Sequence, residues 1–186
     1  MAMAATACNK ASVEAPSVSD AQTLTVSASL PLTRLAVDKG KVTWTEGDQI
    51  AVYNSSGSKF VLTLAEGAGT NFGKFSGTFD GTLNTDIAVY PAAYAGDNAG
   101  EVVIPSIEKR TDGIPAVMAS ALEVSGSDVN ATCFHHLMAV MEFTLEDIPA
   151  YACAFKLWSK EGIQLSGTYT VNSSLDGYRH SSMVKA

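Results

Sequence analysis

Two adjacent histidines, His135 and His136, come nearest to a chemical site in this chain. Imidazole is a common metal ligand, but a zinc site needs several Cys, His or carboxylate ligands around one ion. Neighbouring residues of a β-strand point to opposite faces, so these two side chains cannot ligate one metal without a bend. The third histidine, His180, lies far along the chain. We therefore expect packed or hydrogen-bonded histidines and no metal site.

Carboxylates are a second source of possible chemistry. Glu46 and Asp48 form an acid pair in sequence, but acid–base catalysis needs two carboxylates that flank a substrate, and neighbours across a tight turn rarely do so. We expect Asp48 to cap a turn in which Gly47 has a positive φ. The acidic and amide residues at 97–98 and 128–130 are expected in loops. No D-x-D-x-D-G calcium loop is present.

Motifs for nucleophilic or nucleotide chemistry are absent from the sequence. There is no Gly-x-Ser-x-Gly elbow, and Gly67-Ala-Gly69 does not continue into a phosphate-binding G-x-G-x-x-G. The net charge of −7 and the lack of any basic cluster argue against a nucleic-acid partner. We expect neither an enzyme nor a cofactor.

The three cysteines, Cys8, Cys133 and Cys153, do not form a disulfide framework. Their number is odd, and no C-x-x-C spacing suggests zinc. Cys133 and Cys153 stand in apolar runs and are expected to be small buried thiols. If residues 134–145 and 151–159 form a hairpin, the two Cα atoms are too far apart for a bond.

The residues before Cys8 are small, as at the end of a bacterial lipoprotein signal peptide. In such a peptide the cysteine is lipidated, but here the charged region is missing and the apolar region is short. The alternative is a tail with a chance cysteine. Residues 9–22 are small and polar, so we expect 1–22 to be a residual signal and a disordered, flexible tether. No apolar run is long enough to span a bilayer.

From Leu24 onward the sequence reads as short strands, and 46% of the chain is hydrophobic, which is enough for a full core. Apolar and polar residues alternate between Gly, Asn and Asp turns, which predicts a β-sandwich or barrel. Residues 117–122 fit a helical turn or a strand equally well. Strands are expected at 24–30, 32–37, 42–45, 49–54, 60–64, 72–77, 86–90, 101–105 and 162–171.

Residues 133–145 are expected to form a strand that is covered on both sides, because both of its faces are apolar at the centre. Leu137 lies on one face, and Phe134 and Met138 on the other. Its expected antiparallel neighbour is 151–158, after a turn at 147–150.

Several ordered segments resemble the fimbrillin family, the type V pilins and related surface lipoproteins of Gram-negative anaerobes. Each motif alone is weak, but their order matches the N-terminal part of such proteins from about Thr33 to Val171. The segments are Thr33-Arg34, then Val42–Tyr53 with Trp44, Gly47 and Asp48, then Phe75-Ser-Gly77-Thr-Phe79, Val89-Tyr-Pro91 and Phe134–Phe143.

The resemblance implies a transthyretin-like, Greek-key β-sandwich, mostly antiparallel, over residues 23–171. Members usually carry a second β-sandwich domain, so residues 172–186 are expected to be a tail that starts a truncated second domain. The resemblance also implies export to the outer membrane and the cell surface, with Cys8 as the lipidated residue.

In pilin members a protease cleaves after an arginine near the first strand, and Arg34 is the matching position here. Removal of that strand opens a groove that a strand from the next subunit fills. The resemblance thus implies a fimbrial subunit whose partners are other subunits or copies of itself, with a role in adhesion to a host or bacterial surface ligand.

A glycan-binding surface lipoprotein is the alternative, because β-sandwiches also display aromatic platforms. Aromatic residues on strands are more often core than platform. The candidates are Trp44, Tyr53, Tyr90, Tyr94, Trp158 and Tyr169.

Overall fold

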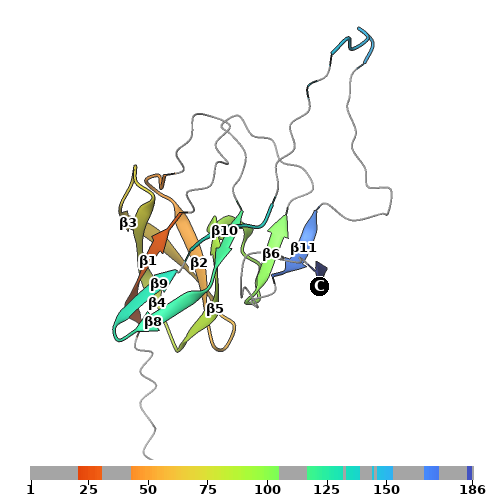
Figure 1. The fold of residues 1–186 in the computed structure, drawn as a ribbon. Helices are drawn as coiled ribbons and strands as arrows, with labels where there is room; N and C mark the ends of the chain where they lie inside the picture. Colours follow the sequence, from red (N-terminus) through yellow and green to blue (C-terminus); the bar gives the residue numbers. More distant parts are fainter. Residues whose placement is uncertain are drawn as a thin grey trace, which may run out of the picture.

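The computed structural model describes residues 21–30, 43–104, 117–131, 133–138, 144, 146–152, 166–171 and 184–185. Within these ranges the chain is all-β, apart from one short 3-10 turn, η1 (Ala92–Tyr94), and this confirms the expected fold class (Figure 1). The tether expected at 1–22 and the strand expected at 32–37 lie outside the described residues, except for residues 21 and 22.

Nine of the strands form one sheet in the order β10-β7-β5-β2-β3-β4-β1-β9-β8. Every neighbouring pair is antiparallel except β1 and β9, which run parallel. The strands are β1 (Gln22–Ser29), β2 (Gln49–Asn54), β3 (Lys59–Glu66), β4 (Phe72–Phe79), β5 (Leu83–Tyr90), β7 (Met118–Ser120), β8 (Leu122–Ser125), β9 (Asp128–Ala131) and β10 (His135–His136).

This sheet curls around an inner core. Ala121 alone separates β7 from β8 in the chain, yet the two strands lie in opposite halves of the sheet, and β8 contacts β5. The half-barrel shape is visible in Figure 1. Its inner face holds a buried apolar cluster with Trp44, Phe75 and Phe134 at its centre.

A second sheet covers part of the outer face. It has the order β12-β11-β6 and consists of β6 (Glu101–Ile104), β11 (Gly167–Thr170) and β12 (Val184–Lys185). Val102, Ile104 and Tyr169 pack there against outward residues of β2, β5 and β7, such as Tyr53 and Val89. Because the middle of β2 and the C-terminal half of β5 are covered on both faces, residues 50–53 and 87–90 are continuously apolar rather than alternating.

The strand expected at 42–45 is wrong for its described part, because residues 43–45 have no strand structure. The backbone of Trp44 bonds instead to the loop between β3 and β4: Trp44 N–H donates to Thr70 O at 2.8 Å, and Gly69 N–H donates to Trp44 O at 2.8 Å. The expected partner strand, β2, already has β3 on one side and β5 on the other. No edge of β2 remains for residues 43–45.

The long strand expected at 133–145 is also wrong where it is described. Only His135 and His136 are in strand β10, and the chain bends at Leu137. Phe134 enters the inner core while Leu137 and Met138 join the outer cluster. Thr144 and residues 146–152 are not in strands, which also corrects the start of the strand expected at 151–158. Residues 139–143, 145 and 153–165 lie outside the described part.

Other expectations can be compared directly. The ambiguous segment at 117–122 is strand, and the last expected strand is β11, which pairs with both β6 and β12. Residues 128–130, expected in a loop, belong to β9. Val129 and Ala131 face the core there while the exposed Asp128 and half-buried Asn130 alternate with them, a period-two pattern too short to recognise in the sequence. The transthyretin-like Greek-key topology stays a prediction.

Candidate functional site

The first strand in the described part of the chain, β1, lies inside the sheet rather than at its edge. β1 pairs antiparallel with β4 along its whole length, from Gln22 opposite Phe79 to Ser29 opposite Phe72. On its other side it pairs parallel with β9. A strand in this position satisfies the backbone of both neighbours, so without it two edges would lack partners. We call the space that β1 fills between β4 and β9 the β1 slot.

Alternate side chains of β1 enter the inner core. Val26 and Ala28 are 0% and 1% exposed, Leu30 just after the strand is 4% exposed, and Leu24 is half-buried against the same cluster. The intervening Thr and Ser residues face outward and are exposed or half-buried. The period-two pattern in this part of the sequence therefore arises, as expected, because alternate side chains of β1 face the core and the outside.

The residues of β4 that lie opposite the inward residues of β1, which we call the floor of the β1 slot, are small or aromatic. Gly77, Phe75 and Gly73 lie opposite Leu24, Val26 and Ala28 respectively. A Cβ added at Gly73 would lie 2.8 Å from Trp44 Cδ1 and 2.7 Å from Leu64 Cδ1, and one added at Gly77 would lie 2.9 Å from Leu62 Cδ2. Because Gly73 and Gly77 have no Cβ, the side chains of Trp44, Leu62 and Leu64 can pack directly against the backbone of β4.

Two backbone hydrogen bonds hold the C-terminal end of β1. Ser29 O accepts from Phe134 N–H at 3.3 Å, and Leu30 N–H donates to Asn71 O at 2.8 Å. The first bond connects β1 to the segment just before β10, and the second connects it to the loop before β4. The end of β1 is therefore fixed by segments from both halves of the curled sheet.

Three residues singled out from the sequence meet in one aromatic cluster. The ring of Trp44 makes edge-on contacts with Phe75, Tyr90 and Phe134, at centroid distances of 4.8, 5.0 and 5.9 Å. Trp44 is 1% exposed, and both phenylalanines are fully buried. The cluster places the three sequence landmarks Trp44, Phe75 and Phe134 beside the β1 slot.

Asp48 is a turn residue, as expected, and it has a second contact. Its Oδ2 accepts from Thr45 N–H at 2.7 Å, and Gly47 has a φ of 87°. Its Oδ1 accepts from the hydroxyl of Tyr90 at 3.0 Å. Asp48 therefore connects the turn after Trp44 to β5, a role that the sequence did not indicate.

Of the remaining residues singled out from the sequence, some lie in the described ranges and others lie outside them. Gly77 lies in β4, and Pro91 follows β5 after a cis peptide bond. Cys8, Arg34 and Phe143 lie outside the described residues, as do Cys153 and His180.

The histidines lie in β10, paired with Ala119 and Met118 of β7. Both are half-buried, and burial lowers the pKa of each imidazole. His135 lowers the pKa of His136 further, and within the described part of the chain His136 Nε2 is buried with no hydrogen-bond partner. No group of three metal-ligating side chains occurs in the described ranges. Cys133 is half-buried rather than buried, and its thiol donates to Phe134 O at 3.7 Å.

Acid should destabilise the protein through these histidines. The unfolded chain, with histidine pKa values near about 6.5, binds protons more readily than the folded chain does. The stabilising contribution is therefore complete above about pH 6.5 and decreases as the pH falls towards the lowered pKa of the folded state. Urea unfolding between about pH 7.5 and pH 5 measures this slope. The double variant His135→Gln, His136→Gln should have a shallower slope, and an unchanged slope would contradict the prediction.

The aromatic residues considered for glycan stacking are interior residues where they are described. Trp44, Tyr53, Tyr94 and Tyr169 are at most 9% exposed, and Tyr90 is half-buried. The hydroxyl of Tyr53 donates to Gly96 O at 2.9 Å inside the outer core. Trp158 lies outside the described residues. These five rings therefore provide no exposed platform.

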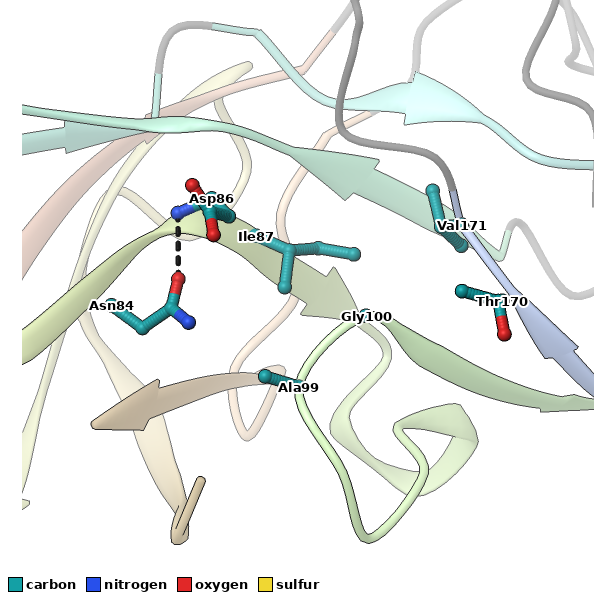
Figure 2. A pocket seen from close by; sticks show the side chains of 7 residues that line it. All are labelled: Asn84, Asp86, Ile87, Ala99, Gly100, Thr170 and Val171. Atoms are coloured by element: carbon teal, nitrogen blue, oxygen red, sulfur yellow. Dashed lines mark hydrogen bonds between the residues drawn. The ribbon is translucent and has the colours of Figure 1, made fainter. Parts of the chain in front are cut away.

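A small pocket lies where β5 bulges away from β2. The register of the two strands shifts between Ala51 and Tyr53, and Asp86 N–H donates to Asn84 Oδ1 at 2.8 Å (Figure 2). The pocket has a volume of about 160 Å³, below the roughly 300 Å³ at which small-molecule sites begin. Its lining is Asn84, Asp86, Ile87, Ala99, Gly100, Thr170 and Val171, with one carboxylate among them. We assign no chemistry to it.

The β1 slot is thus the described feature with the clearest capacity for recognition, since it combines two strand edges with a shaped apolar floor. Sequence reasoning identified β1 and several floor residues but missed Ala28 and Gly73 as a matched pair. None of the helical structure described here has the length and apolarity needed to cross a membrane. No family model, curated protein or solved structure matches this chain.

Proposed function

We propose that this protein is a structural subunit of cell-surface fimbriae and assembles by strand addition in the β1 slot. The observation that supports the proposal most is the position of β1, an N-terminal strand held between β4 and β9. In the sequence, Arg34 lies after β1 and before the rest of the sheet. Cleavage after Arg34 would make β1 a separate peptide held by non-covalent contacts alone.

Loss of that peptide would be unfavourable unless another strand replaced it. The edges of β4 and β9 would lose their backbone partners, and the core surface under Val26, Ala28 and Leu30 would be exposed to water. Burial of a Val or Leu side chain contributes about 1.5–3 kcal/mol, so the empty slot would bind an extended apolar strand. A strand from a neighbouring subunit restores both the hydrogen bonds and the burial.

The order of Cys8, β1 and Arg34 along the chain gives this proposal a second consequence. If Cys8 carries the lipid, the anchor and β1 lie on the same side of Arg34. After cleavage, replacement of β1 by a strand from another subunit would then also free the body of the subunit from the outer membrane. Adhesion would follow from the resulting polymer on the cell surface.

Treatment of the full chain with an arginine-specific protease tests the proposal. N-terminal sequencing should find a new end at Leu35, and electron microscopy and native mass spectrometry should find polymers after cleavage. Arg34→Ala should remain monomeric, whereas Arg110→Ala, a matched control at another arginine, should polymerise like the wild type. A chain cleaved at Arg34 that remains monomeric would contradict strand addition, and so would polymers of Arg34→Ala.

A further inference from the structure

We infer that the β1 slot selects its occupant by side-chain size at one position, the one held by Ala28. The inference rests on the proposed strand addition and extends it by naming the chemistry of the partner. That partner is an extended peptide with apolar residues at alternate positions and a glycine, alanine or serine at the position of Ala28.

Small residues flank Ala28 on both neighbouring strands. Gly73 of β4 and Ala131 of β9 are its direct partners in register. Ala28 is 1% exposed and Ala131 is 4% exposed, so the position is closed to solvent. Three small residues side by side would leave a hole in the core unless a large group from elsewhere filled it.

The indole of Trp44 occupies the space in front of Gly73, one of these three residues. It lies against Gly73, since a Cβ at that glycine would be 2.8 Å from Trp44 Cδ1 and 3.0 Å from Trp44 Nε1. The indole is itself held by edge-on contacts with Phe75 and Phe134. A larger side chain at position 28 would have to displace a ring that is packed on several sides.

The hydrogen bond next to this position makes displacement harder still. Ser29 O accepts from Phe134 N–H, so the residue after Ala28 is tied to the residue whose ring contacts Trp44. A shift of the β1 backbone away from Phe134 would lengthen this bond, which is 3.3 Å long. An oversized side chain would therefore cost either the bond or the aromatic packing.

Larger side chains are accepted at the other inward positions of β1. Val26 lies opposite Phe75 and beside Val129, Leu24 is half-buried opposite Gly77, and Leu30 is buried just beyond the strand. The outward Thr25 is exposed. From residue 24 to residue 30, the inward side chains are therefore large, medium, small and large. The strict size limit applies to the third of them, Ala28.

Peptide exchange tests the inference in the full chain. A recognition sequence for a site-specific protease, placed within residues 31–42, allows the chain to be cut while β1 stays bound. A fluorescent peptide of residues 21–34 should then exchange into the slot, as measured by anisotropy. Peptides with Ala28→Gly or Ala28→Ser should bind within about 10-fold of the wild-type peptide, and Ala28→Leu should bind at least about 10-fold more weakly. Thr25→Leu, which adds bulk on the exposed face, should bind like the wild type.

The outcomes separate the two proposals. If the wild-type peptide exchanges and Ala28→Leu binds equally well, size selection is overturned while strand addition stands. If no peptide exchanges, strand addition in this slot is overturned. The size limit at position 28 is then tested by urea unfolding of the uncut chain. Ala28→Leu should lower the midpoint of unfolding, and Thr25→Leu should not. Equal midpoints for these two variants would overturn it.

Discussion

Replacing Trp44 with alanine should lower the free energy of unfolding by about 3–5 kcal/mol. The indole is 1% exposed and contacts three aromatic rings, and it also covers the backbone of Gly73. Its removal would leave a cavity at the point where the turn before β2, the β1 slot and the segment before β10 meet. Urea unfolding followed by circular dichroism measures the loss.

Phe72→Ala is the matched control, because this ring is 46% exposed on the other face of β4. We expect a loss of about 1 kcal/mol or less for that variant. Should Trp44→Ala cost no more than Phe72→Ala, the aromatic cluster would not be the centre of the inner core. Trp44→Phe, which retains an aromatic ring, should fall between the two.

Alkaline pH should destabilise the protein through Tyr53. Burial, together with the negative charges of Glu101 and Asp97, raises the pKa of this phenol from 10.0 to about 12. The folded chain keeps the phenol protonated, whereas the unfolded chain loses the proton near its ordinary pKa. The stabilising contribution is therefore complete below about pH 10 and is lost as the pH rises towards about 12, by up to about 2–3 kcal/mol.

Tyr53→Phe isolates this effect from other alkaline titrations. The variant loses the hydrogen bond to Gly96 O, so it should be less stable at neutral pH by about 1 kcal/mol. Its stability should, however, fall less steeply than that of the wild type above about pH 10. Parallel pH profiles of the two proteins would show that the buried phenol does not control alkaline unfolding.

Local alternation was enough to predict the strands whose two faces differ. β1 and β3 alternate between core and solvent, and both were expected within two residues of their observed limits. The strand expected around Trp44 is wrong because this apolar residue is buried without strand pairing. Tertiary contacts with the loop at 69–70 satisfy its backbone, and a local pattern carries no sign of such a partner.

The long strand expected after Cys133 is wrong in its described part for a related reason. Phe134 and Leu137 enter two different cores, which a long strand and a short strand followed by a bend can both achieve. The β1 slot itself was beyond sequence reasoning, since the pairing of Ala28 with Gly73 and Ala131 depends on register between distant segments. The role of Trp44, which occupies the space in front of Gly73, requires the position of a fourth segment.

The parallel pairing of β1 with β9 has a consequence for biosynthesis. β1 leaves the ribosome well before β9, its parallel partner at residues 128–131. β1 therefore stays unpaired on that side until residues 128–131 have been made. Contacts between such distant segments form late because the intervening loop must close first. β1 should thus be among the last of the described strands to be paired on both sides.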